Sequence, residues 1–370
     1  MESNTSCIID VKSVYARFQK IRDHRKARGK RYDLATILLC MFLAKMCGED
    51  KPSGIAEWAR HRQAWISQTL NLKRTALPSH NTYRRVLGEA ISEDEFEELS
   101  RQLFGHYGQS GYRVVVSIDG KAMRGTIDPD HNQGLCLLAV YLPSEGVTLA
   151  QIAIETKQNE ISAAPKLLNW VDLRNKVVIG DAMHTQRQVS IQIGAARGKF
   201  IWVVKGNQPQ LQQDLQDWFD TEVALLPGMG CPPKDFCSVT TTNKGHGRLE
   251  IRTLTTSSQL NDFLDWPFLQ QVFKLERRVT IQKTGKTRHE VVYGVTNLSA
   301  EEASPGELLK MLRSYWQIEN GLHYRRDVTL HEDETRFSQN SAALLCPFFS
   351  FRPIYFITSS RNNKPHPPGE

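Results

Sequence analysis

The sequence predicts an α/β protein in which a helical region of about 110 residues precedes a mixed β-sheet core. Two observations support this fold class. Apolar residues in the first 110 positions follow helical spacing, and from residue 113 onward short β-branched runs alternate with helical segments. The 370 residues are enough for two domains, and 40% hydrophobic with 24% charged residues is the composition of a folded chain rather than a disordered one.

The N-terminal region carries most of the basic charge. Residues 10–88 contain 17 lysines and arginines against 6 acidic residues, whereas the net charge of the whole chain is only +7. Eight of these basic residues lie between Arg17 and Arg31. A local excess of this kind is typical of a module that binds nucleic acid.

Four helices are predicted in this region after the basic segment. They cover residues 33–47 with Asp33 as the N-cap, 53–68, 79–90 and 92–105. The second and third resemble a helix-turn-helix in which Arg84 and Arg85 would contact DNA. Because their ten-residue connection is long for that motif, a helical bundle that contacts only phosphates is an equal alternative.

The following core is predicted as three strands, a helix, a strand, a helix and a strand. The strands cover residues 114–118, 135–142, 147–154, 176–179 and 200–204, and the helices cover 163–171 and 185–197. Polar strands at 249–255, 273–282 and 289–295 then mark residues 207–298 as a β-rich insertion. Residues 301–324 return to a helix, so the order is that of an α/β core with an insertion.

Several protein classes are disfavoured. The longest apolar run, residues 34–44, is too short to cross a membrane, and the N-terminus lacks the pattern of a secretory signal. The seven cysteines form no Cys-x-x-Cys pair, which disfavours a zinc ribbon or a disulfide framework. The sequence has neither a Gly-x-x-x-x-Gly-Lys phosphate loop nor a Gly-x-Ser-x-Gly elbow. We expect a cytoplasmic protein without a membrane partner.

Two aspartates follow buried core strands. Asp119 is expected to end the first strand, and Asp181 follows the fourth. Ligands of open α/β sheets bind beyond the carboxyl ends of strands, so adjacent strands would bring both carboxylates to one point. Close carboxylates repel each other unless a cation lies between them, and oxygen ligands suit Mg²⁺ or Mn²⁺. The alternative for each aspartate alone is a turn or helix-cap residue.

A third carboxylate stands on the predicted C-terminal helix. One apolar face of that helix ends in Glu319, which would point toward Asp119 and Asp181 at the edge of the core. A buried, unpaired glutamate is costly unless it binds a metal or a cation. An ion pair with Arg313 or Arg325 is the alternative. The apolar face consists of Leu308, Leu312 and Tyr315.

Six short motifs follow one another along the chain. They are SIDGK at 117–121, NEI at 159–161, GDAM at 180–183, VKGNQ at 204–208, GHGRLEIR at 245–252 and WQIENGLHY at 316–324. In this order they resemble the H-repeat-associated insertion-sequence transposases of bacteria, a DDE family with an RNase H-like core. The resemblance spans roughly residues 20–340.

The resemblance implies both an architecture and a chemistry. An α-helical DNA-binding region at 1–110 would precede an RNase H-like core at 111–340, with a β-rich insertion at about 207–298 and a tail at 341–370. Asp119, Asp181 and Glu319 would form a catalytic triad that binds two Mg²⁺ or Mn²⁺ ions. Water would cut DNA at the element's end, and the freed 3′-hydroxyl would attack target DNA. The implied partners are double-stranded DNA, as terminal inverted repeats and as target, and a second copy of the chain.

Further residues are candidates for DNA contact or for support of the triad. Lys121 and Arg124 follow the first aspartate and could hold phosphates, although a solvated basic loop is an equal alternative. Asn320 and His323 could orient Glu319 or could simply pack. The other candidate DNA contacts lie after the fifth strand and in a glycine-flanked turn of the insertion: Lys205, Asn207, Gln208, His246 and Arg248.

The last thirty residues depart from the family pattern. Where the family continues with a basic helix, this chain has an aromatic run interrupted by Pro347 and Pro353. This change favours a shifted frame or a truncation near residue 341. A catalytically inactive, DNA-binding remnant is therefore a second hypothesis, and another RNase H-like nuclease, such as a junction resolvase, is a third.

Overall fold

The computed structural model describes residues 10–27, 30–49, 51–89, 93–104, 113–122, 136–154, 160–220, 234–245, 247–315, 318–324 and 327. Arg124, His246 and the tail at 341–370, which carry predictions from the sequence, lie outside the described residues. The chain divides into two compact units that meet in the sequence between residues 91 and 92. Each unit has its own buried residues.

The first unit consists of helices packed around one buried helix. Asp33 is the N-cap of that helix, as predicted, since its carboxylate accepts a hydrogen bond from the Thr36 backbone N–H at 3.2 Å. The helix is buried on every side, including its one charged residue, Lys45. No helix in the described part of the chain is long and apolar enough to span a membrane. The helices are α1 (Val11–Phe18), the buried α2 (Leu34–Met46), α3 (Pro52–His61), α4 (Gln63–Thr69) and α5 (His80–Glu89).

The predicted helix over residues 53–68 is divided in the structure. Helices α3 and α4 are separated at Arg62, and α5 packs against α3. Helix α5 is amphipathic. Tyr83 and Val86 are buried, whereas Arg84 and Arg85, which lie between them in the sequence, are exposed. The two arginines are thus accessible, as a DNA contact requires.

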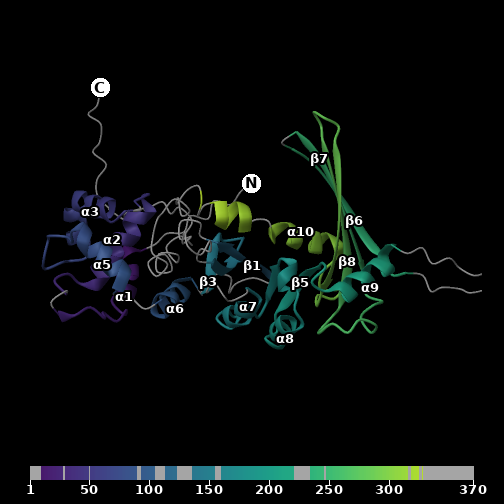
Figure 1. The fold of residues 1–370 in the computed structure, drawn as a ribbon, viewed down its shortest axis with the longest axis horizontal. Helices are drawn as coiled ribbons and strands as arrows, with labels where there is room; N and C mark the ends of the chain where they lie inside the picture. The colour runs from purple at the N-terminus through teal and green to yellow at the C-terminus, as the bar shows by residue number, and fades with distance from the viewer. Residues whose placement is uncertain are drawn as a thin grey trace, which may run out of the picture. The chain divides into compact units, whose positions relative to one another are not determined.

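A nine-stranded sheet forms the centre of the second unit (Figure 1). The strand order is β3-β2-β1-β4-β5-β9-β8-β7-β6. The strands are β1 (Val114–Ala122), β2 (Cys136–Leu142), β3 (Val147–Ile154), β4 (Lys176–Gly180), β5 (Lys199–Val204), β6 (Cys237–Gly245), β7 (Arg248–Ser257), β8 (Gln271–Ile281) and β9 (Thr287–Thr296). The helices are α6 (Glu93–Phe104), α7 (Glu160–Leu168), the 3-10 helix η3 (Ala182–His184), α8 (Arg187–Ala195), α9 (Pro209–Asp220), α10 (Pro305–Tyr315) and the π-helix η4 (Ile318–His323).

The first five strands have the connections of an RNase H-like core. Strands β1, β2 and β3 form an antiparallel meander, and β4 and β5 lie parallel to β1 on its other side. Helix α7 joins β3 to β4, and α8 joins β4 to β5. This arrangement confirms the α/β fold class predicted from the sequence.

Side chains of the central strands alternate between two cores. On β4, Val178 contributes to the core formed with α7, α8 and α9, whereas Val177 and Ile179 contribute to the core formed with α10. Figure 1 shows α7 and α8 on one face of the sheet and α10 on the other. Burial on both faces explains why this strand is a continuous apolar run in the sequence.

The insertion extends the same sheet rather than forming a separate one. Strand β9 pairs antiparallel with β5, and β8, β7 and β6 follow outward. The sequence does not predict β6, because its polar residues Cys237–Gly245 have no apolar face. At the junction, Gly294 of β9 lies between β5 and β8, where an added Cβ would overlap the Phe273 ring and the Trp202 carbonyl oxygen.

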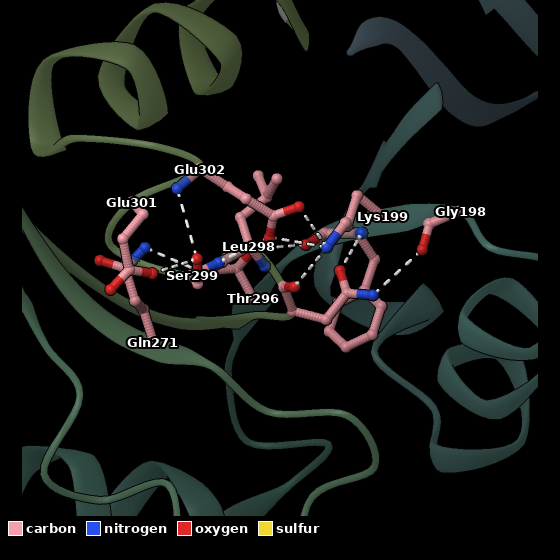
Figure 2. Close-up of polar contacts among 10 residues, drawn as sticks. Gly198, Lys199, Gln271, Thr296, Leu298, Ser299, Glu301 and Glu302 are labelled. Carbon is pink, nitrogen blue, oxygen red and sulfur yellow. Dashed lines mark hydrogen bonds and ion pairs between the residues drawn. The ribbon is translucent and has the colours of Figure 1, made fainter. Parts of the chain in front are cut away.

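A polar cluster holds the loop that leads from β9 into α10 (Figure 2). The Asn297 side chain accepts a hydrogen bond from the Phe200 N–H at 2.7 Å and donates one to the Gly198 carbonyl oxygen at 3.1 Å. Lys199 forms an ion pair with Glu302 at 2.6 Å. These contacts anchor the start of α10 to β5. Further hydrogen bonds in Figure 2 come from Gln271, Thr296 and Ser299.

Gly294 provides a test of the junction between core and insertion. Gly294→Ala should lower the free energy of unfolding by about 1–3 kcal/mol, because the added Cβ overlaps a buried ring and a backbone oxygen. Gly245→Ala is the matched control, since an added Cβ there meets nothing within 4 Å. Urea denaturation of both variants measures the difference, and equal effects would contradict the packing described.

Candidate active site

The parallel pairing of β1 and β4 brings two of the predicted carboxylates to one edge of the sheet. The last paired residues are Ile118 of β1 and Gly180 of β4, and the residues that follow them are Asp119 and Asp181. Asp119 lies inside β1 and does not end it as expected, because β1 continues along β2 to Ala122. Both aspartates therefore lie at the carboxyl edge of parallel strands, where open α/β sheets bind ligands.

Asp181 begins the turn after β4. Its carboxylate accepts a hydrogen bond from the Ala182 N–H at 2.7 Å and caps η3, so the helix-cap alternative is realised as well. The ammonium of Lys205, from the loop after β5, lies 3.3 Å from the same carboxylate oxygen. Both side chains are about half exposed, which leaves this end of the site accessible to a substrate.

Asp119 is more enclosed. Its carboxylate accepts a hydrogen bond from the Gly120 N–H at 3.0 Å, and His323 Nδ1 lies 3.9 Å from the other oxygen. The side chains of Asp119 and His323 are only 18% and 10% exposed. His323, predicted from the sequence as a supporting residue, therefore lies next to the first carboxylate of the predicted triad, and its role stays a prediction.

The third predicted carboxylate, Glu319, belongs to η4. This π-helix packs through Ile318 and Leu322 against β2, the strand beside β1. The single helix predicted over residues 301–324 is thus two described helices, α10 and η4. The side chains of Glu319 and Asn320 lie outside the described residues, so their roles stay predictions.

Glu160 also reaches this edge, from the start of α7. An added Cβ at Gly120 would overlap its carboxylate, which also lies 3.9 Å from Cys136 Sγ and 3.7 Å from His184 Nε2. Burial raises the pKa of the Glu160 carboxyl above its ordinary value, and the charge of Asp181 adds to the rise. In the sequence Glu160 stands out only as part of the NEI motif at 159–161, and its place at the start of the first core helix is the signal that could have found it.

His184 is the last residue of η3, the helix that Asp181 caps, and its ring lies next to Glu160. Its side chain is fully buried, and neither ring nitrogen has a hydrogen-bond partner among the described residues. Burial lowers the pKa of His184 to about 4 against the opposing charge of Asp181, so the ring is neutral at pH 7. Burial likewise raises the pKa of the Cys136 thiol to about 11, with further contributions from the charges of Glu160 and Asp119.

Several side chains that the sequence predicts as DNA contacts form ion pairs or hydrogen bonds within the protein. Lys121, which is mostly buried, forms an ion pair with Asp327. The side-chain amides of Asn207 and Gln208 donate hydrogen bonds of 2.7 and 2.9 Å to carbonyl oxygens of Ala182 and Thr185. These amides brace the turn that carries the second aspartate, and their assignment as DNA contacts stays a prediction.

The donor set at this edge suits a hard divalent cation. Asp119, Asp181 and Glu160 supply carboxylate oxygens, and the buried Glu160 Oε2 has no hydrogen-bond partner among the described residues. In the part of the chain that the structure describes, no three such side chains are close enough together to form a complete metal site. The Glu319 side chain is not part of that description, so the fit to the cation rests on the chemistry of the donors: carboxylate oxygens, one of them buried without a partner, are the ligands that Mg²⁺ and Mn²⁺ prefer.

Known protein families share this chain's organisation. Residues 111–345 match the family model described as Transposase DDE domain, which is more than half of the chain and contains every described strand of the sheet. The chain belongs to the DDE transposase family. Residues 15–103 match a second model, described as DDE_Tnp_1-associated, so the resemblance inferred from the motifs is confirmed.

Similar proteins extend over most of this DDE transposase. It is 26% identical to "H repeat-associated putative transposase YhhI" of Escherichia coli strain K12, over 95% of this chain and 92% of that protein. It is 31% identical to "Uncharacterized protein in dhlA 3'region" of Xanthobacter autotrophicus, over 70% of this chain and 87% of that one. A solved piggyBac transposase synaptic complex with hairpin DNA covers 94% of this chain and 75% of its own, at 8% identity and a TM-score of 0.41. That likeness is loose, so the fold assignment rests on the strand order of the sheet itself.

The buried His184 makes stability depend on pH. Its pKa is about 4 in the fold against an ordinary 6.5, so between these values the unfolded chain binds a proton that the folded chain does not. This contribution is complete above pH 6.5 and is lost as the pH falls toward 4, by up to about 3 kcal/mol. His184→Gln should therefore lose less stability than the unaltered protein between pH 7 and pH 4 in urea unfolding. Parallel stability curves would contradict the assignment.

Proposed function

We propose that this DDE transposase cleaves DNA at the ends of an insertion sequence and joins them to target DNA in a reaction that requires a divalent cation. The observation that carries the proposal is the register of β1 and β4, which sets Asp119 and Asp181 side by side at one edge of the sheet. The family supplies the reaction class. The proposed place of action is the bacterial cytoplasm, where such DNA lies.

In this proposal Asp119, Asp181 and Glu319 hold two Mg²⁺ or Mn²⁺ ions. When bound, two such ions lower the pKa of the attacking oxygen and stabilise the leaving oxygen. Two contacts support the inclusion of Glu319: η4 packs against β2 beside β1, and His323 approaches Asp119. The positions of Glu319 and His323 are four residues apart, which is about one helical turn.

Neighbouring residues would orient these carboxylates. The η3 cap fixes Asp181, and the Gly120 N–H and His323 flank Asp119. Lys205 is an exposed cation beside Asp181, and a phosphodiester entering the site would compete for its ammonium group. This position supports the prediction that Lys205 contacts DNA.

The tip of the insertion offers a second DNA-binding surface, here called the basic tip. The β6–β7 and β8–β9 hairpins lie side by side there, because β7 pairs with β8 (Figure 1). Six exposed basic side chains gather at or near the two turns, and none is ion-paired within the described residues. We propose that they contact DNA phosphates without reading sequence. They are Lys244, Arg248, Arg278, Lys283, Lys286 and Arg288.

The division of labour along the chain is also a proposal. The helical region at 1–110, with Arg84 and Arg85, would bind the terminal repeat, and the core at 111–340 would carry the chemistry. The β-rich insertion at about 207–298 would contribute its basic tip. A homodimer would supply one active site for each of the two ends of the element.

Single substitutions of the three carboxylates test the active site. Asp119→Asn, Asp181→Asn and Glu319→Gln should each slow Mg²⁺-dependent cleavage of DNA that carries the element's ends by about 100- to 1000-fold, because each removes a negative cation ligand at nearly constant size. The measurement is cleavage of end-labelled DNA with Mg²⁺ and with a chelator. Glu145→Gln is the control. It makes the same change in the β2–β3 turn, at the end of the β1–β2–β3 meander opposite the carboxylates, and this variant should cleave DNA normally.

The same assay separates the alternatives. Normal cleavage by one of the three variants would refute the role of that carboxylate. A non-catalytic remnant would bind the DNA ends without metal-dependent cleavage, and a resolvase-like nuclease would cleave without joining ends to target DNA.

We expect the basic tip to make the affinity for DNA depend more steeply on salt concentration. Lys283→Ala combined with Lys286→Ala should reduce the slope of log affinity against log salt by up to about 2, since each phosphate contact contributes roughly 0.9. Fluorescence anisotropy of labelled DNA at several salt concentrations measures the slope. Lys310→Ala, which removes an exposed lysine of α10, is the control. An unchanged slope in the double variant would exclude these two lysines from the DNA interface.

A further inference from the structure

We propose that Glu160 is a fourth carboxylate ligand of the divalent-cation site, reaching it from the α7 side of the sheet. The inference rests on the proposed role of Asp119 and Asp181 and adds a ligand outside that triad. Its ligand class is a hard divalent cation of the Mg²⁺ or Mn²⁺ kind, because every proposed donor is a carboxylate oxygen.

First, β1 has an open edge beyond its pairing with β4. Pairing between β1 and β4 ends at Ile118 and Gly180, so the next residues of β1 have no paired strand residue on that side within the described chain. Asp119 occupies this edge, and the Glu160 carboxylate lies directly over Gly120, the following residue, where any Cβ would displace it. The glycine therefore allows a carboxylate from α7 to approach the edge at which Asp119 stands.

Second, no lysine or arginine lies in an ion pair with Glu160 among the described residues. Its polar side-chain neighbours in that part of the chain are Cys136 and His184. Its Oε2 is buried and makes no hydrogen bond within the described chain. A carboxylate removed from water in this way is costly, and a bound cation offsets that cost.

Third, the imidazole of His184 faces Glu160. It is fully buried, lacks any hydrogen-bond partner in the described structure, and directs Nε2 toward Glu160 Oε2 at 3.7 Å. It lies on η3, the turn that Asp181 caps. The 3.7 Å separation is longer than a hydrogen bond, and a small shift of the carboxylate on binding an ion would let the ring donate to one oxygen while the other faces the ion. Metal-bound carboxylates are usually hydrogen-bonded in this way.

Cation titration of the full chain tests this inference. Mn²⁺ binding, measured by isothermal titration calorimetry, should weaken by about 10-fold or more in Glu160→Gln. Glu145→Gln removes the same charge in the β2–β3 turn and should bind Mn²⁺ as the unaltered protein does. Asp119→Asn should lose Mn²⁺ binding in the same experiment. Circular dichroism compares the folding of the variants.

A double-mutant cycle gives a test that is independent of the charge change. Gly120→Ala should weaken Mn²⁺ binding, because its Cβ displaces the Glu160 carboxylate. In a Glu160→Ala background the space is free, so Gly120→Ala should then have no further effect. Additive effects of the two substitutions would mean that Gly120 acts through Asp119 alone, and would overturn the inference.

The outcomes separate this inference from the proposed function. If Glu160→Gln binds Mn²⁺ normally while Asp119→Asn does not, the triad stands and the fourth ligand is wrong. If Asp119→Asn also binds Mn²⁺ normally, the proposed site itself is wrong. Weakened binding in Glu160→Gln, together with a non-additive cycle, supports the fourth ligand.

Discussion

The edge at which Asp119 and Asp181 lie depends on the parallel pairing of β1 with β4. Both strands are buried on two faces, so a shift of their register by one residue would turn each side chain toward the wrong core. The register that fills both cores also ends the pairing at Ile118 and Gly180. Two aspartates thus become neighbours through the packing of the apolar residues that precede them, and their position needs no contact of their own.

The same pairing creates an electrostatic problem that the surrounding residues moderate. Carboxylates on neighbouring strands repel one another, and burial makes their charges harder to solvate. A backbone N–H donates a hydrogen bond to Asp119, and Asp181 caps a helix and lies beside Lys205. The groups next to Glu160, His184 and Cys136, are neutral at pH 7. No arginine or lysine among the described residues neutralises the whole group, which supports the proposed binding of a cation there.

The insertion covers the other edge of the five-stranded core, at β5. Strand β5 would otherwise be an exposed edge, open to pairing with another chain, and β9 covers it. The close approach of β9 requires a glycine beneath the Phe273 ring, and the polar cluster around Asn297 then fixes the start of α10. The segment that carries Glu319 is consequently anchored to the core through the insertion's last strand, although more than a hundred residues separate it from Asp181 in the sequence.

Local patterns determined much of this protein. Apolar β-branched runs predicted the core strands, and the position directly after one of these runs singled out Asp181. Clustered lysines and arginines predicted the basic helical region. All three signals are local, because residue type and spacing are properties of neighbouring positions. The tertiary structure alone decided that Asp119 lies within a strand, that Lys121 pairs with Asp327, that polar β6 joins the sheet, and that Glu160 of α7 lies over Gly120. Each of these depends on strand register or on contacts between distant segments, and such contacts are set by the packing of the whole core and leave no local periodicity in the sequence.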